Sequence, residues 1–398
     1  MEPSSRQILI VGLLAPILLA ACTSPSASVS RHSTTTAAGS TDPATTSSSG
    51  QAGPHPTTSG TSLPLDIYAN DRPGMLSPIV KDMPSRIYVP NSGSSTVSEI
   101  DPATMKVIRS FRVGKNPQHV VPSWDLKTLY VASDQGNSLT PIDPVTGHPG
   151  AAIPVDDPYN LYFTTDGGSA IVVAERLARL DFRDPHTFAL QQSVPVPCKG
   201  VDHLDFSADG SFLVASCEFA ASLIKVRLNG SGGPALDGVP LLLSPGAKPQ
   251  DVKLSPDGRI FYVADMVRGG VWEIDGLNMR VLDFVPTGAG AHGLYVSRDS
   301  TSMFVSNRDE GTVSVLDFAS RRITAKWKIP GSASPDMGGV SADGKTLWLA
   351  GRSDSEIYAI DTTSGTLKGR IPVGQGPHGL CVYPQPGTYS LGHTGIFR

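Results

Sequence analysis

A short apolar segment recurs seven times along this chain at a spacing close to 42 residues. The central residues of successive segments lie 42, 42, 41, 49, 42 and 44 positions apart. The segments are 87–89, 129–131, 171–173, 212–214, 261–263, 303–305 and 347–349. A repeat of this length, with room for several strands, is typical of propeller blades. We therefore predict an all-β, seven-bladed β-propeller with four-stranded blades.

Each repeat also carries related turn signals, with Ser-x-Asp-Gly or a relative of it at the first turn. Ser-x-Asp-Gly stands at 207–210, 255–258 and 341–344, and Asp-Gly between two β-rich runs predicts a hairpin. A later strand ends in an apolar residue followed by Asp, at Asp101, Asp143, Asp181, Asp275, Asp317 and Asp361. A ring of catalytic carboxylates is one interpretation. We favour turns in which the carboxylate accepts local backbone N–H bonds. In the fourth repeat Arg227 replaces this Asp, and an insertion is expected around 229–238.

The two ends of the repeat array are complementary. The first repeat lacks its innermost strand, whereas 374–380 reads as an inner strand with no blade after it. We expect the C-terminal strand to join the first blade, because that pairing hides two open sheet edges. The propeller is then 87–386, preceded by a lead-in segment at 63–86 and followed by a tail at 387–398.

The N-terminus has the features of an export signal. Arg6 precedes an apolar run over 8–21, which is too short for the roughly 20 residues of a membrane span. The run ends Leu19-Ala20-Ala21-Cys22, which resembles the lipobox of bacterial lipoproteins. That resemblance implies a signal peptide at 1–21 and lipidation of Cys22. The protein would then be anchored on the extracytoplasmic face of the cell membrane; the alternative is an ordinary secretory signal.

The segment that follows Cys22 is too polar to fold. Ser and Thr occupy 21 of the 40 positions in 23–62, so little apolar surface is present to offset the entropy of ordering. We predict a disordered tether over 22–62. The net charge is −4 and the sequence contains no basic run. It therefore lacks the positively charged patch that is typical of nucleic-acid-binding proteins.

Cysteine usage fits an exported protein. The four cysteines contain no Cys-x-x-Cys motif, so a zinc ribbon and a redox pair lack their usual signature. The turn at Asp209-Gly210 brings Cys198 near Cys217, and we predict a disulfide between them in an oxidising compartment. Cys381 is expected to be a buried free thiol.

Aligned repeats place polar residues at two consecutive positions where inner strands begin. These are the candidate ligand-binding residues, which we call the collar: His119, Asp202, His203, Asp251, His292, Asp336 and His378. A hydrated polar rim is the simplest interpretation. The alternatives are a small-molecule or metal site, because His and Asp are good ligands and acid–base groups, and a catalytic site. We expect the carboxylates to raise the pKa of neighbouring histidines.

Several stretches resemble the YVTN-repeat propellers of bacterial surface-layer and exported proteins. They are Ile87-Tyr88-Val89-Pro90-Asn91, the run Thr-Val-Ser-Val-Leu-Asp at 312–317, and Gly-Pro-His-Gly at 376–379. The resemblance covers about 87–384 and implies the seven-bladed fold. That family includes binding proteins, and its wider relatives include lactonases, a lyase and a d1-haem domain.

From this resemblance we expect a binding or scaffold protein, with a lactonase or lyase working in the channel as the alternative. No catalytic residue is assigned. No cofactor is expected other than a divalent metal at the channel mouth, which stays an open alternative. The expected partners are the membrane, through the lipid, and a protein, small molecule or sugar; a monomer is favoured.

Overall fold

The computed structural model describes residues 65–398. The predicted signal peptide at 1–21, the lipidation site Cys22 and the tether at 22–62 lie outside the described residues. Within the described part, secondary structure consists of strands and three short 3-10 helices, η1 (Ala69–Asp71), η2 (Glu218–Ala220) and η3 (His393–Gly395). No helix in this part is both long and apolar enough to span a membrane.

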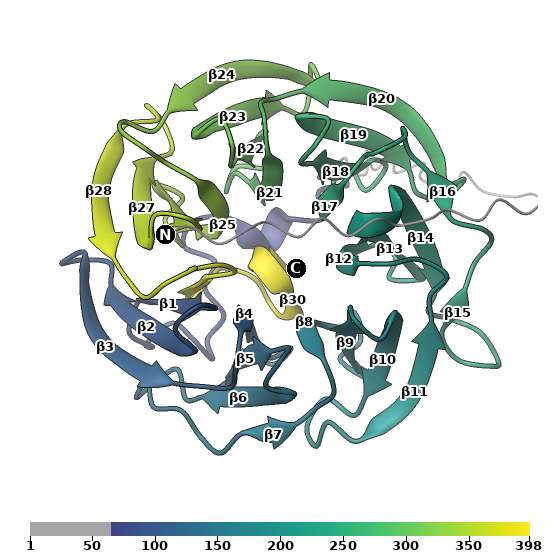
Figure 1. Cartoon of the computed structure of the whole chain (residues 1–398), viewed down its shortest axis with the longest axis horizontal. Coiled ribbons are helices and arrows are strands. Elements are labelled where there is room, and N and C mark those ends of the chain that lie inside the picture. Colours follow the sequence, from purple (N-terminus) through teal and green to yellow (C-terminus); the bar gives the residue numbers. More distant parts are fainter. Residues whose placement is uncertain (1–64) are drawn as a thin grey trace, which may run out of the picture. The chain divides into compact units, whose positions relative to one another are not determined.

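Seven antiparallel sheets stand around a common axis, as Figure 1 shows, and this confirms the predicted seven-bladed propeller. The innermost strands are β29 (Cys381–Tyr383), β4 (Pro117–Pro122), β8 (Pro158–Phe163), β12 (Val201–Phe206), β17 (Pro249–Leu254), β21 (Ala291–Val296) and β25 (Pro335–Val340). The second strands are β1 (Arg86–Asn91), β5 (Leu129–Ser133), β9 (Ala170–Ala174), β13 (Phe212–Cys217), β18 (Phe261–Asp265), β22 (Ser302–Asn307) and β26 (Thr346–Gly351).

The outer half of each blade is built in the same order. The third strands are β2 (Thr96–Asp101), β6 (Ser138–Ile142), β10 (Arg179–Arg183), β14 (Ser222–Arg227), β19 (Gly270–Asp275), β23 (Thr312–Asp317) and β27 (Glu356–Asp361). The outer strands are β3 (Lys106–Arg112), β7 (Ile153–Pro154), β11 (Leu190–Pro195), β15 (Ala235–Leu236), β16 (Leu241–Leu242), β20 (Arg280–Pro286), β24 (Arg322–Lys328) and β28 (Leu367–Pro372). In the fourth blade β15 and β16 both pair with β14 across the predicted insertion.

Burial explains why the apolar signal repeats once per blade. Strands such as β5 and β18 are buried at every position, because blades pack against both of their faces. Outer strands such as β24 alternate between exposed and half-buried residues, since one face meets solvent. The sequence signal is therefore strongest at the second strand and weakest at the rim.

The ring closes with a C-terminal strand in the first blade, as predicted, but this strand is β29 at 381–383 and not the predicted segment 374–380. β29 pairs antiparallel with β1, with Tyr88 opposite Cys381 and Ile87 opposite Val382. Together with β2 and β3 these strands form one four-stranded blade from the two ends of the repeat array. This pairing satisfies the ladder of both strands, which would otherwise be open edges.

Most of the recurring aspartates lie in turns, with one correction. Asp101 and Asp143 accept hydrogen bonds from backbone N–H groups two residues further on. Asp181, however, is buried within β10 and is bound by Arg179 and Arg183. The turn in this blade is made by Asp184, whose carboxylate accepts two local backbone N–H bonds. The apolar-Asp pattern selected Asp181 because Leu180 precedes it.

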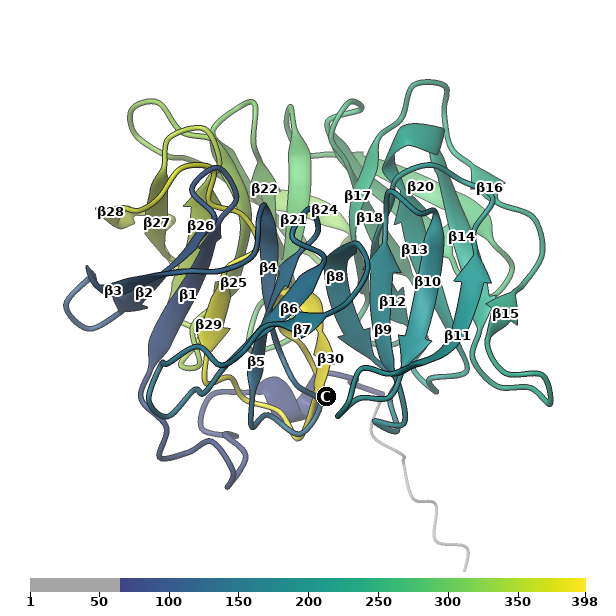
Figure 2. The same cartoon turned by 60° about the horizontal axis from the view of Figure 1, so that its bottom comes forward.

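Both ends of the described chain pack at one end of the ring. The tail predicted at 387–398 turns back into the channel, where β30 (Ser390–Gly392) pairs with β8 and with β31 (Ile396–Phe397). Figure 2 shows this yellow segment near the purple lead-in segment that carries η1. Leu391 and Ile396 are fully buried, so the C-terminal segment is part of the core.

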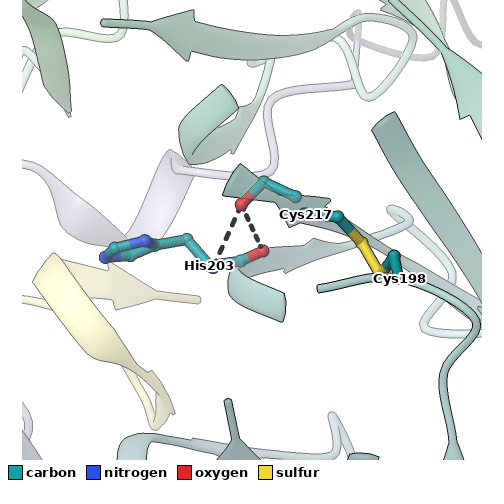
Figure 3. The surroundings of a disulfide bond; sticks show 4 residues. Cys198, His203 and Cys217 are labelled. Carbon is teal, nitrogen blue, oxygen red and sulfur yellow. Dashed lines mark hydrogen bonds between the residues drawn. A yellow bond between two sulfur atoms is a disulfide. The ribbon is translucent and has the colours of Figure 1, made fainter. Parts of the chain in front are cut away.

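The structure joins Cys198 and Cys217 in a disulfide, with their Cα atoms 6.0 Å apart. The bond links the segment just before β12 to the last residue of β13 (Figure 3). In the ladder, Cys217 pairs with Val201. Cys381 is buried and unpaired within the described residues. The disulfide therefore fixes the strand that carries the collar residues Asp202 and His203.

Candidate functional site

In six of the seven blades the collar arises from a bulge at the beginning of the inner strand. The ladder to the second strand shifts register between Val201 and Leu204 in β12, and between Pro335 and Gly338 in β25. The same irregularity occurs at the corresponding place in β4, β8, β17 and β21. A bulge frees residues from the ladder and re-aims their side chains. The collar residues of these blades, such as Asp202 and His203, are thereby released from the regular alternation.

The first cluster on the axis consists of three histidines. The ring of His393 lies 4.2 Å from that of His119 and 4.6 Å from that of His203, measured between centroids. One nitrogen from each ring lies within 4.8 Å of the other two. All three side chains are buried. Because β4 and β12 belong to blades that are not neighbours, His393 from the C-terminal segment bridges them.

Two glycines make room for this cluster. A Cβ atom on Gly379 would lie 1.8 Å from Nδ1 of His119, so the ring of His119 occupies the space of the missing side chain. Gly392, with φ of +121°, would place a Cβ 2.5 Å from the carbonyl oxygen of Leu161. Only glycine adopts this backbone conformation readily, and it directs the next residue, His393, toward the axis.

The second cluster lies beside the first and contains His292, Asp336 and His378. Nδ1 of His292 is 3.2 Å from Oδ1 of Asp336, and Nε2 of His378 is 3.6 Å from Oδ2. Arg308 donates from Nε and Nη2 to Oδ1 at 3.1 and 2.5 Å. Nδ1 of His292 also lies 3.0 Å from the sulfur of Met337. The rings of His378 and His119 are 4.8 Å apart, so the two clusters adjoin.

The two remaining collar carboxylates differ in role. Asp202 is buried, and its Oδ1 lies 3.0 Å from Nδ1 of His203, although the atoms do not meet in hydrogen-bond geometry. Asp251 instead accepts backbone N–H bonds from Val252 and Leu294. It therefore ties two blades together and does not join either cluster.

The expectation that carboxylates raise the histidine pKa values holds only for His203. There the nearby Asp202 outweighs the opposing effect of burial. Burial lowers the pKa of His119, His292, His378 and His393 well below the ordinary value, helped by neighbouring histidines or arginines. Burial thus favours the neutral form of these four rings, and a neutral imidazole has the lone pair that binds a metal ion.

Sequence reasoning missed three residues of these clusters. His393 lies after the last blade, where the repeat gives no equivalent position. Met337 stands in the second collar position, but it is apolar and was left out of the candidate set. Arg308 lies on the loop after β22, a position that varies from blade to blade. The only signal in the sequence that the tail returns to the core is its apolar residues, such as Leu391 and Phe397. The structure buries both of them.

A ring of seven four-stranded blades around a buried polar axis defines a seven-bladed β-propeller of the repeat-containing class. The chain belongs to the YNCE-like beta-propeller family, whose model matches residues 76–385. No curated protein matches the sequence significantly.

Solved structures share the fold at low identity. A functionally unknown protein from Desulfotomaculum acetoxidans is 16% identical, with a TM-score of 0.65 over 75% of this chain and 98% of that one. The periplasmic gluconolactonase PpgL of Pseudomonas aeruginosa is 21% identical, with a TM-score of 0.63 over 76% and 99%. The Kuenenia stuttgartiensis hydrazine synthase is 18% identical, with 0.59 over 72% and 98%.

Proposed function

We propose that this chain is an extracytoplasmic, lipid-anchored β-propeller that binds a divalent transition-metal ion through His119, His203 and His393. One observation carries the metal site. Five ring nitrogens of these histidines are buried without a hydrogen-bond partner in the described part of the chain: both of His119, both of His203 and Nε2 of His393.

Unpartnered buried nitrogens are costly, and a metal ion removes that cost. A buried polar group without a partner costs about 1–3 kcal/mol. Imidazole is a common ligand of zinc, at about 2.0–2.1 Å. The candidate nitrogens of the three rings lie within 4.8 Å of one another, so modest inward rotations would bring them to one ion. Three imidazoles leave the fourth tetrahedral position open to water or a ligand.

Removing two of the three ligands should abolish tight zinc binding. We expect the metal-free protein to take up one zinc ion at this site with a rise in melting temperature. His119→Ala combined with His393→Ala should weaken zinc binding by about 100-fold or more, equivalent to roughly 3 kcal/mol. The measurement is a competition titration of the full chain against a chromophoric zinc chelator.

The matched control replaces the same residue type away from the axis. His148 and His186 are exposed, and replacing both with Ala should leave zinc affinity and melting temperature unchanged. Melting of the metal-free double variant at 119 and 393 separates lost ligands from lost folding. Zinc binding that survives this double change in a folded protein would refute the site.

A lactonase acting in the channel is the second candidate function. The open fourth position would suit a metal-bound water, which zinc can activate. The similarity of this chain to a gluconolactonase is a similarity of fold and does not itself assign an activity. The zinc-loaded protein should be assayed on aldonolactones: turnover that disappears in the variant at 119 and 393 favours the enzyme, and no turnover favours a binding protein.

The lipid anchor has its own test. Because the segment before Cys22 resembles a lipobox, Cys22→Ala should release the protein from the membrane fraction. Fractionation of cells followed by immunoblotting measures this, and mass spectrometry of the mature N-terminus identifies the acyl groups. An unmodified Cys22 in membrane-bound mature protein would contradict the anchor. Ser24→Ala, in the Ser-rich segment after Cys22, is a control that should stay membrane-bound.

A further inference from the structure

We infer that the second axial cluster, formed by His292, Asp336, Met337 and His378, is a separate site for monovalent copper. This site lies beyond the proposed function and uses none of the three histidines assigned to zinc. Its four residues come from β21, β25 and the segment that precedes β29, so three neighbouring blades contribute to it.

The donor atoms converge on one side of His292. Its Nδ1 atom lies 3.0 Å from the thioether sulfur of Met337 and 3.2 Å from a carboxylate oxygen of Asp336. Nε2 of His378 approaches the other carboxylate oxygen at 3.6 Å. At most 4% of each of these side chains is exposed. Ligand atoms of the two imidazoles and the carboxylate thus lie within 4.8 Å of one another in a buried region, and the thioether adjoins one of the imidazoles.

The thioether separates this donor set from that of the first cluster. Soft sulfur ligands select copper(I), whereas imidazole alone also suits zinc and other divalent ions. Met337 is fully buried, and the hydroxyl oxygen of Tyr295 lies 3.9 Å from its sulfur. The first cluster consists of the imidazoles of His119, His203 and His393. The two neighbouring clusters therefore differ in the softness of their donors.

Charge also favours a monovalent ion at the second cluster. Arg308 donates two hydrogen bonds to Oδ1 of Asp336, so the carboxylate is already neutralised. Nε of Arg352 lies 3.9 Å from Oδ2. A divalent cation would meet twice the repulsion from these guanidinium groups that a monovalent cation meets. Oδ2 has no hydrogen bond and is left to complete the coordination.

Replacing the sulfur tests the proposal. Met337→Leu removes the thioether while nearly conserving volume. Under anaerobic conditions we expect this change to weaken copper(I) binding by at least about 10-fold, measured against a chromophoric copper(I) chelator. We expect zinc binding at the first cluster to change by less than about twofold. Met266→Leu is the matched control, because Met266 contacts Arg308 outside the cluster, and copper(I) affinity should be unaffected.

X-ray absorption on wild-type protein loaded with one equivalent of copper(I) should show a sulfur neighbour, and this needs no variant to fold. The sulfur signal should persist in the variant with His119→Ala and His393→Ala, which lacks the zinc site. Failure of the zinc proposal would therefore leave this result intact. Copper(I) coordination without sulfur in wild-type protein, or undiminished copper(I) affinity in folded Met337→Leu, would overturn the inference.

Discussion

Phe397→Ala is expected to lower the free energy of unfolding by about 3–5 kcal/mol, the usual cost of deleting a buried aromatic side chain. Phe397 is 1% exposed, although it stands next to the last residue of the chain. It packs in one cluster with Val80, Tyr88 and Val120. The ring therefore joins the lead-in segment, the closing blade and the second blade.

Urea-induced unfolding of the full chain measures this change. Val239→Ala is the matched control, because Val239 is 83% exposed and a surface substitution usually changes stability by less than about 0.5 kcal/mol. The Phe397 variant should also bind zinc more weakly, since His393 lies on the same segment. A loss below about 1 kcal/mol would mean that the C-terminal segment does not pack in the channel.

The sequence predicts the fold well because the signals that specify a blade are local. Hairpin turns such as Asp209-Gly210 and the doubly buried second strands recur at a fixed spacing, so each repeat supports the interpretation of the others. The closure by β29 also follows from counting strands. The position of residues 387–398 in the channel cannot be predicted in this way, because this segment lies outside the repeat and contacts several blades at once.

The candidate site could be predicted only as a set of positions. Equivalent positions in a propeller meet at the axis, and this brought His119, His203 and His378 into consideration. The bulges that aim His119 and His203 depend on tertiary packing and leave no periodic signal. The predicted direction of the pKa shift was wrong for His119, because burial and the neighbouring His378, His203 and Arg352 all lower its pKa.

The second large expected effect is a dependence of protein stability on pH, and it comes from Asp71 on η1. It is 4% exposed, and one of its carboxylate oxygens has no hydrogen-bond partner. It lines a small cavity of about 30 Å³ together with Lys253 and Arg298. Burial raises the pKa of Asp71 to about 7, although Arg298 and Arg398 oppose the shift.

Between the ordinary carboxyl pKa and the raised pKa of Asp71, the folded protein holds a proton that the unfolded chain has released. The stability that Asp71 contributes in its protonated form is therefore present below pH 4 and is lost as pH rises through about 7. Between pH 5 and pH 8 this loss amounts to about 2–3 kcal/mol. Above pH 8 no further loss from this group is expected.

Asp71→Asn should remove that dependence, because the amide has nearly the same volume and does not titrate. We expect the variant to gain stability over wild type by about 2–3 kcal/mol when pH is raised from 5 to 8. The measurement is urea unfolding of both proteins at several pH values. Asp82→Asn, at an exposed position of the same lead-in segment, controls for loss of a negative charge. Parallel pH profiles for wild type and Asp71→Asn would show that Asp71 is already ionised in the folded protein at pH 5, because its charge is balanced by Arg298 and Arg398.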